Sequence, residues 1–212
     1  MKLGEFKLEA LKLMFVELGY NENYDTNELI ERIAYNENYR DYMYNMPGAI
    51  NRCFSILEEK RVLPTKRKEL IRQETGSNGV LRFDLDLIED FFDIDRVVYD
   101  NDNGEYVGSC DYQREGNVII LPPIGEEERY TVLYKPRLQR ITSKTDNGMD
   151  VPIPDHIAAY VPYFIKGDLY RDDEPNEASE ARNWFEAAIE STLESRANKV
   201  NGVQNTYSQT EM

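Results

Sequence analysis

The spacing of apolar residues divides the chain into three stretches, and this division constrains the fold most strongly. Up to about residue 60, and again over 155–193, apolar residues recur every three or four positions, the period of an amphipathic helix. Over 80–135 they alternate, as in strands with one buried face. The sequence therefore predicts an α+β protein: a helical bundle body with an inserted antiparallel β-rich domain and a flexible C-terminal tail.

Turn-forming and polar segments set the predicted domain boundaries. Residues 1–79 form an N-terminal helical region, and 80–150 form the β-rich excursion. Residues 151–196 form a C-terminal helix pair that packs on the helical body. The last segment, 197–212, is rich in Asn, Gln, Ser and Thr, and it has too few apolar residues to fold alone, which predicts a flexible tail.

Three helices are predicted in the N-terminal region. The first ends at Gly19, and the second begins at a capping box formed by Asp25 and Glu28. The third carries an apolar stripe from Tyr39 to Leu57 that continues through Pro47. This stripe predicts one helix kinked at the proline, with two separate helices as the alternative.

About four antiparallel strands are predicted in the middle of the chain. The segments 96–99 and 105–107 flank Asn103-Gly104, a strong hairpin signal because both residues tolerate positive φ. The segments 118–121 and 130–134 form a second predicted pair.

The C-terminal helix pair is joined by the acidic turn Arg171–Glu174. Asp155 is placed to cap the first helix, and Pro162 predicts either a kink or a later start. Pro175 suits the first position of the second helix, whose alanines favour close antiparallel packing. The predicted contacts of the pair come from Val161, Ile165, Leu169, Ala181, Trp184 and Phe185.

The charge balance narrows the range of partners that the protein could bind. There are 25 basic and 40 acidic residues, a formal net charge of −15, which disfavours a free-standing nucleic-acid binder. The one basic concentration lies at 60–72; its Lys66, Arg67 and Lys68 are interpreted as a solvated connector or as a patch that meets an acidic partner subunit. No apolar run approaches the ~18 to 20 residues that span a bilayer, which predicts a cytosolic protein.

A search for catalytic and metal-binding patterns returns nothing specific. His156 is the only histidine, and Cys53 and Cys110 have no metal-ligand spacing. Asp172 and Glu174 are the candidate pair for an acidic-residue hydrolase, but directly before a helix they are better interpreted as capping it. A DNA-binding regulator built on 5–60 lacks a basic recognition helix. The sequence predicts a protein that is not an enzyme and needs no cofactor or metal.

Several segments from Phe83 onward resemble the head–tail connector (adaptor, or ring) proteins of tailed bacteriophages. The resemblance spans about 83–190. It is carried by the segments Leu87–Val97, Asn117–Pro123, Tyr130–Pro136, Val151–His156, Leu169–Glu174 and Ala178–Phe185.

The resemblance implies a structural subunit in the neck of a virion, assembled in the host cytoplasm. It implies a homo-oligomer, commonly a twelve-fold ring, that binds a portal protein and a tail or second neck-ring protein and lets DNA pass without sequence-specific binding. A C-terminal segment would run along the portal, with Asn198, Val200, Val203 and Tyr207 as the candidate contacts. A stopper or tail terminator is the alternative within the same class.

Overall fold

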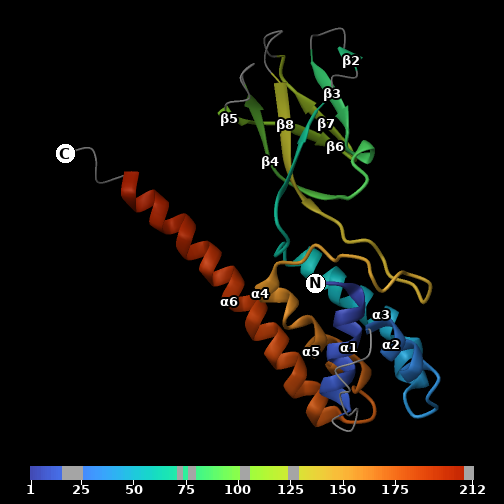
Figure 1. The fold of residues 1–212 in the computed structure, drawn as a ribbon. Helices are drawn as coiled ribbons and strands as arrows, with labels where there is room; N and C mark the ends of the chain where they lie inside the picture. Colours follow the sequence, from blue (N-terminus) through green and yellow to red (C-terminus); the bar gives the residue numbers. More distant parts are fainter. Residues whose placement is uncertain (16–25, 71–73, 76–79, 101–105, 124–128, 208–212) are drawn as a thin grey trace. The chain divides into compact units, whose positions relative to one another are not determined.

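The computed structural model describes residues 1–15, 26–70, 74–75, 80–100, 106–123 and 129–207 (Figure 1). For residues 26, 74–75, 100, 106–107 and 196–207 it describes the backbone alone. The chain divides into two compact units. The helical unit comprises Met1–Val62 and Arg140–Met212, and the β unit comprises Leu63–Gln139. Mixed helix and antiparallel sheet confirm the α+β class.

The helical unit is organised around one short central helix. Its elements are α1 (Leu3–Met14), α2 (Thr26–Ala34), α3 (Arg40–Glu59), α4 (Asp155–Ala158), α5 (Val161–Leu169) and α6 (Pro175–Tyr207). Helix α5 contacts α1, α3, α4 and α6, and α1 also contacts α2. The two ends of the chain therefore complete one core together.

The third predicted helix is one continuous helix. Pro47 lies inside α3, and the apolar stripe through Met46, Ile50 and Cys53 is buried. The burial of this stripe explains why the helix tolerates a proline, since packing outweighs one lost backbone hydrogen bond. Helix α1 ends at Met14, and the predicted stop at Gly19 and cap at Asp25 lie outside the described residues.

Two helices, α4 and α5, replace the single helix predicted from residue 155. Pro162 lies in the first turn of α5, where its missing N–H breaks no hydrogen bond, so of the two alternatives the later start is the observed one. The predicted cap at Asp155 is wrong: Pro154 precedes the first turn of α4, and Asp155 lies within that turn. An acidic residue there still favours the positive end of the helix dipole.

The β unit consists of two antiparallel sheets of four strands. One sheet has the order β1-β8-β4-β5 and the other β2-β3-β7-β6. The strands are β1 (Lys66–Glu69), β2 (Glu74–Thr75), β3 (Leu81–Asp84), β4 (Phe91–Asp100), β5 (Tyr106–Cys110), β6 (Gln113–Glu115), β7 (Val118–Leu121) and β8 (Arg129–Pro136). A 3-10 turn at Leu85–Leu87 connects β3 toward β4.

The strand pairing confirms one predicted hairpin and corrects the other. Strands β4 and β5 pair antiparallel as predicted, while the predicted turn at Asn103-Gly104 lies outside the described residues. Strand β7 pairs with β3 and β6, whereas β8 pairs with β1 and β4, so the second predicted pair belongs to two different sheets. Strand β1 was missed because its Lys-Arg-Lys-Glu sequence has no apolar alternation and all four residues are exposed.

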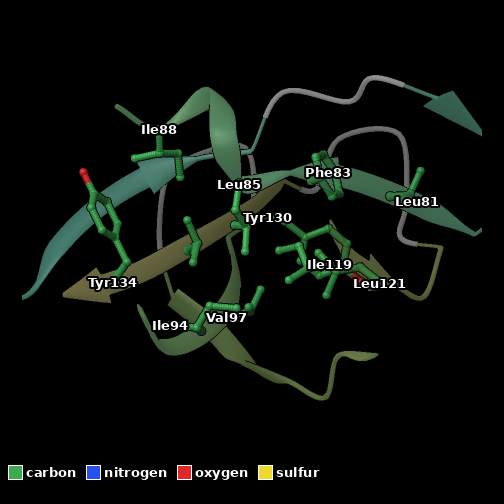
Figure 2. Close-up of a cluster of buried hydrophobic side chains, with 11 residues drawn as sticks. Leu81, Phe83, Leu85, Ile88, Ile94, Val97, Ile119, Leu121, Tyr130 and Tyr134 are labelled. Carbon is green, nitrogen blue, oxygen red and sulfur yellow. The ribbon is translucent and has the colours of Figure 1, made fainter. Parts of the chain in front are cut away.

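Both sheets contribute to the core of the β unit (Figure 2). Leu81 and Phe83 of β3 point inward while Arg82 points outward, as the two-residue period of a strand requires. They meet residues from the other sheet, including Val97 and Tyr130. The core residues are Leu81, Phe83, Leu85, Ile88, Ile94, Val97, Ile119, Leu121, Tyr130, Val132 and Tyr134.

The borders of the β unit lie at 63 and 139, whereas the sequence placed them at 80 and 150. At its start, Lys135 Nζ donates to the Leu63 carbonyl at 3.1 Å and to Thr65 Oγ1 at 2.8 Å. After residue 139 the chain returns to the helical unit, where Asn51 exchanges two hydrogen bonds with the backbone of Ile141 at 2.7 and 2.8 Å. The basic segment therefore belongs mostly to the β unit, and the polar loop 142–148 belongs to the helical unit.

Helix α6 extends further than the sequence predicts. The flexible tail was placed from 197 onward, but the backbone remains helical to Tyr207. Asn, Gln and Thr have only modest helix propensity, so this extension continues a helix that its packed first half has already nucleated. The flexibility of 197–212 stays a prediction.

Candidate assembly surfaces

The residues considered for catalysis lie on different elements, His156 on α4 and the pair Asp172 and Glu174 in the turn before α6. His156 is exposed on α4, and Asp172 pairs with its exposed neighbour Arg171 at 3.4 Å. Within the described residues, no group of three His, Cys, Asp or Glu side chains could hold a metal ion. Cys53 and Cys110 are free thiols in different units, and burial, reinforced by the charge of Asp168, raises the pKa of Cys53 well above its ordinary value.

The C-terminal helix pair forms largely as predicted. Val161, Ile165, Ala181 and Phe185 are buried, and Leu169 is half-buried. The rings of Phe164 and Phe185 meet edge-on at a centroid distance of 5.0 Å. This contact joins α5 to α6 through the largest side chains that the two helices bury against each other.

Trp184 is the exception, and its predicted place in the core of the pair is wrong. Its side chain is 55% exposed, whereas Phe185 is 1% exposed. Adjacent residues on a helix point about 100° apart, so two neighbours cannot both face α5. Trp184 instead lines a groove between α4 and α6 with a volume of about 490 Å³, together with His156 and Tyr160.

Gly167 allows α5 and α6 to approach closely. A Cβ atom at this position would lie 2.7 Å from Cγ of Arg182 and 2.8 Å from the carbonyl oxygen of Ala178, both on α6. These distances are shorter than van der Waals contact, and the carbonyl belongs to the backbone of a packed helix. The small residues that sequence analysis found on α6 thus have a matching small residue on α5.

We expect Gly167→Ala to destabilise the protein, even though alanine is the better helix former. The added methyl group must push the two helices apart, and overpacking of this kind costs about 1–3 kcal/mol. Chemical denaturation followed by circular dichroism measures the change. Gly148→Ala is the matched control, because a Cβ there would meet only the exposed Asp146 side chain. An unchanged or higher stability of Gly167→Ala would contradict the close approach.

A buried carboxylate ties three helices together. The side chain of Asp168 on α5 is 3% exposed and accepts hydrogen bonds from Arg52 on α3 and Arg182 on α6. Arg52 Nε lies 3.2 and 3.0 Å from the two carboxylate oxygens, and Arg182 Nη2 lies 3.1 Å from one of them. Arg182 also stacks on the ring of Phe164 at 5.2 Å. The arrangement is structural, since two fixed cations satisfy one buried anion.

The acidic turn between α5 and α6 is held by aromatic residues. Tyr42 of α3 donates a hydrogen bond to Asp173 at 2.8 Å, and Tyr170 donates to the Met14 carbonyl at 2.6 Å. Burial and the bond to Asp173 raise the pKa of Tyr42 to about 12. Asp173, in the acidic turn before α6, therefore accepts a bond from α3, which fixes where α6 begins.

A second groove on the helical unit combines an apolar floor with an acidic rim, and we call it the acidic groove. Its volume is about 350 Å³. Phe164, Phe185 and Ile189 lie at its floor, and they are at most 3% exposed. It is lined by Ile56, Glu59, Lys60, Phe164, Arg182, Phe185, Glu186, Ile189, Glu190 and Leu193. The sequence search did not single out this surface.

The basic residues Lys66, Arg67 and Lys68 lie on strand β1 at the edge of its sheet. All three side chains are exposed, and the predicted connector is a strand. Exposure fits both a solvated segment and a patch that meets an acidic partner subunit, so the role of the segment stays a prediction. Lys66 pairs with Asp90 of the same unit. Burial would raise the pKa of Asp90, but hydrogen bonds from Lys66 and Tyr134 outweigh it and lower that pKa. Charged residues on an edge strand also hinder unwanted strand pairing.

The predicted portal contacts Asn198, Val200, Val203 and Tyr207 belong to the last part of α6, where the structure describes only the backbone. Positions 200, 203 and 207 recur at helical spacing along that backbone. Their role stays a prediction.

Two general findings complete the description of the chain. None of its described helices contains a stretch long and apolar enough to cross a membrane. Neither the protein-family models nor the curated proteins include a match to this sequence.

Proposed function

We propose that this chain is a structural subunit of the head–tail connector of a tailed bacteriophage. It would form a ring below the portal protein, extend the DNA channel and provide the surface on which the tail docks. The observation that carries the proposal is the path of the chain. Both ends build the helical unit, residues 63–139 form an inserted β unit, and α5 and α6 close the helical core. In the connector family that the sequence resembles, a helical body likewise carries a β-rich excursion, and the chain returns to the body through two C-terminal helices.

The length of α6 supports a role in binding a partner. With 33 residues it is about 50 Å long, whereas its neighbour α5 has 9 residues and is about 14 Å long. Only the first part of α6 can therefore lie against α5. The remainder carries the candidate portal contacts, and a helix that projects from its own core is suited to lie in a groove of another protein.

The charge of the chain fits a channel wall. A formal net charge of −15 repels phosphate groups at a distance, which lets DNA pass without sticking. The partners in this proposal are the portal, a tail or second neck-ring protein, further copies of the chain, and DNA in transit. The location is the neck of the virion, after assembly in the host cytoplasm.

Removal of residues 198–212 tests the proposal. We expect full-length protein to bind purified portal of the same phage and form ring-shaped particles in electron micrographs. The truncated protein should bind at least about tenfold more weakly, a loss of about 1.4 kcal/mol or more. Thermal unfolding should be unchanged, because the core residues of α6 end before residue 196 in the part that the structure describes.

A pair of matched variants sharpens the assignment. Val200→Ser, Val203→Ser and Tyr207→Ser together should weaken portal binding as the truncation does, whereas Asn201→Ser and Asn205→Ser should not. Equal binding by full-length and truncated protein would contradict the assignment of portal binding to residues 198–212. If the full-length protein neither binds the portal nor forms particles, the proposed connector function is wrong.

A further inference from the structure

The acidic groove has carboxylates on α6 that form no ion pair with another residue whose side chain the structure describes. Glu186 and Glu190 line the groove, and Glu194 follows them at the same four-residue interval on α6 without lining it; all three are exposed. Like charges one helical turn apart repel each other and destabilise the helix. In the described part of the chain none of the three forms an ion pair. Of the two cations in the lining, Arg182 is bound to the buried Asp168, which leaves Lys60 beside Glu59, Glu186 and Glu190.

The combination of an apolar floor and an acidic rim defines the chemistry of an occupant. Lysine and arginine side chains satisfy both, because their aliphatic stems pack on apolar surface while their charged ends reach carboxylates. A purely apolar occupant would leave the rim carboxylates desolvated without a partner, which is unfavourable. The occupant should therefore be a segment with several exposed basic side chains.

The chain itself provides such a segment. Strand β1 presents Lys66, Arg67 and Lys68 in succession at the edge of a sheet; all three are exposed, and Lys66 also pairs with Asp90 of its own unit. No other segment of the sequence concentrates positive charge in this way. Two copies with a net charge of −15 repel each other, so contact between them is favoured where a basic surface of one meets an acidic surface of the other.

We propose that the acidic groove of one copy binds strand β1 of a second copy. The groove and the strand are different surfaces, so the contact is heterologous: each copy offers one groove and one strand, and a chain of such contacts can close into a ring. This inference rests on the proposed connector function, for which it names the contact between neighbouring subunits.

Charge reversal tests the contact. A groove variant carries Glu186→Lys and Glu190→Lys, and a strand variant carries Lys66→Glu, Arg67→Glu and Lys68→Glu. Sedimentation velocity at low salt should show concentration-dependent association of the natural protein, weakened at least about tenfold in each variant. An equimolar mixture of the two variants should associate again, because the acidic strand of one then meets the basic groove of the other. Asp172→Lys with Glu180→Lys is the control for net charge, and it should associate as the natural protein does.

Cross-linking gives a second measurement that does not depend on the stability of the reversed variants. In a Cys110→Ser background, protein with Glu190→Cys is mixed with protein carrying Lys68→Cys, and a short bifunctional maleimide is added. Because each chain has one accessible thiol, a product from one thiol of each kind must join two copies. We expect that product with Glu190→Cys and a much lower yield with Glu180→Cys in its place.

The outcomes separate this contact from the connector function. Absence of self-association and of the cross-link at millimolar protein would overturn the contact, as would a mixture of reversed variants that fails to associate. Portal binding by the strand variant, measured at a concentration where the natural protein is monomeric, reports on the connector function alone. If the protein binds the portal but gives no cross-link, the connector function is supported and the contact between the acidic groove and strand β1 is rejected.

Discussion

Replacing Phe185 with alanine should lower the free energy of unfolding of the protein by about 3–5 kcal/mol, the range for deleting a buried phenylalanine. Phe185 is 1% exposed and its ring packs on Phe164, so the substitution leaves a cavity at the junction of α5 and α6. Such a loss is a large fraction of the stability of a small protein. Urea denaturation followed by circular dichroism at 222 nm is the measurement.

The adjacent tryptophan provides the control. Trp184→Ala removes a larger side chain from the same helix, yet it should cost less than about 1 kcal/mol, because surface substitutions have small effects and this side chain is 55% exposed. A cost for Trp184→Ala equal to that of Phe185→Ala would contradict the orientation of α6. Comparable small costs for both would show that the helix pair is not packed through Phe185.

Removing both cations from Asp168 should have a comparable effect. In the double variant Arg52→Met and Arg182→Met, a carboxylate that is 3% exposed loses both of its arginine partners, and an uncompensated buried charge costs about 3–5 kcal/mol. Methionine retains an unbranched apolar stem at each position. Denaturant unfolding of the four proteins of a double-mutant cycle measures the cost.

The single variants should show that the two arginines substitute for each other. Each leaves one cation on Asp168, so each should cost much less than half of the double variant. Additive costs would mean that the arginines act independently and would contradict a shared carboxylate. Arg171→Met is the control, since Arg171 contacts only the exposed Asp172 among the ion pairs that the structure describes.

The helical regions were predictable because their information is local. The stripe through Ile50 and Cys53 has the helical period, and it was sufficient to predict α3 across Pro47. The separation of α4 from α5 also has a local cause, because a proline is accommodated best in a first turn. The spacing of Ala178, Ala181 and Phe185 also places Phe185 on the buried face, so the sequence already contained the signal that Trp184 points elsewhere.

Strand pairing was predictable only where a turn specifies it. The Asn-Gly pair at 103–104 predicted the antiparallel pairing of β4 with β5, whereas β7 and β8 are consecutive strands that join different sheets. Strand β1 is held by backbone pairing with β8, some 60 residues away in sequence, and its exposed basic side chains carry no signal of a strand. Long-range pairing depends on the whole sheet, which no short segment encodes.

The candidate surfaces also combine features that are local in the sequence with features that depend on long-range packing. The carboxylates at 186, 190 and 194 are visible in the sequence as an acidic stripe at helical spacing. The groove beside them requires α3 and α6 each to pack on α5, so only the structure could reveal it. The tie between Asp168, Arg52 and Arg182 also joins residues far apart in the chain, and the three residue types alone do not distinguish it from surface charges.

The discontinuous path of the chain has a consequence for its synthesis on the ribosome. The β unit is one contiguous segment and can fold as soon as residue 139 has left the exit tunnel. Helices α1 and α3 must wait for α5, with their apolar faces uncovered while roughly 100 further residues are translated, which takes roughly 5–20 s. Exposed apolar faces favour aggregation of the nascent chain during that interval, so a pause in translation before residue 161 should lower the yield of native protein.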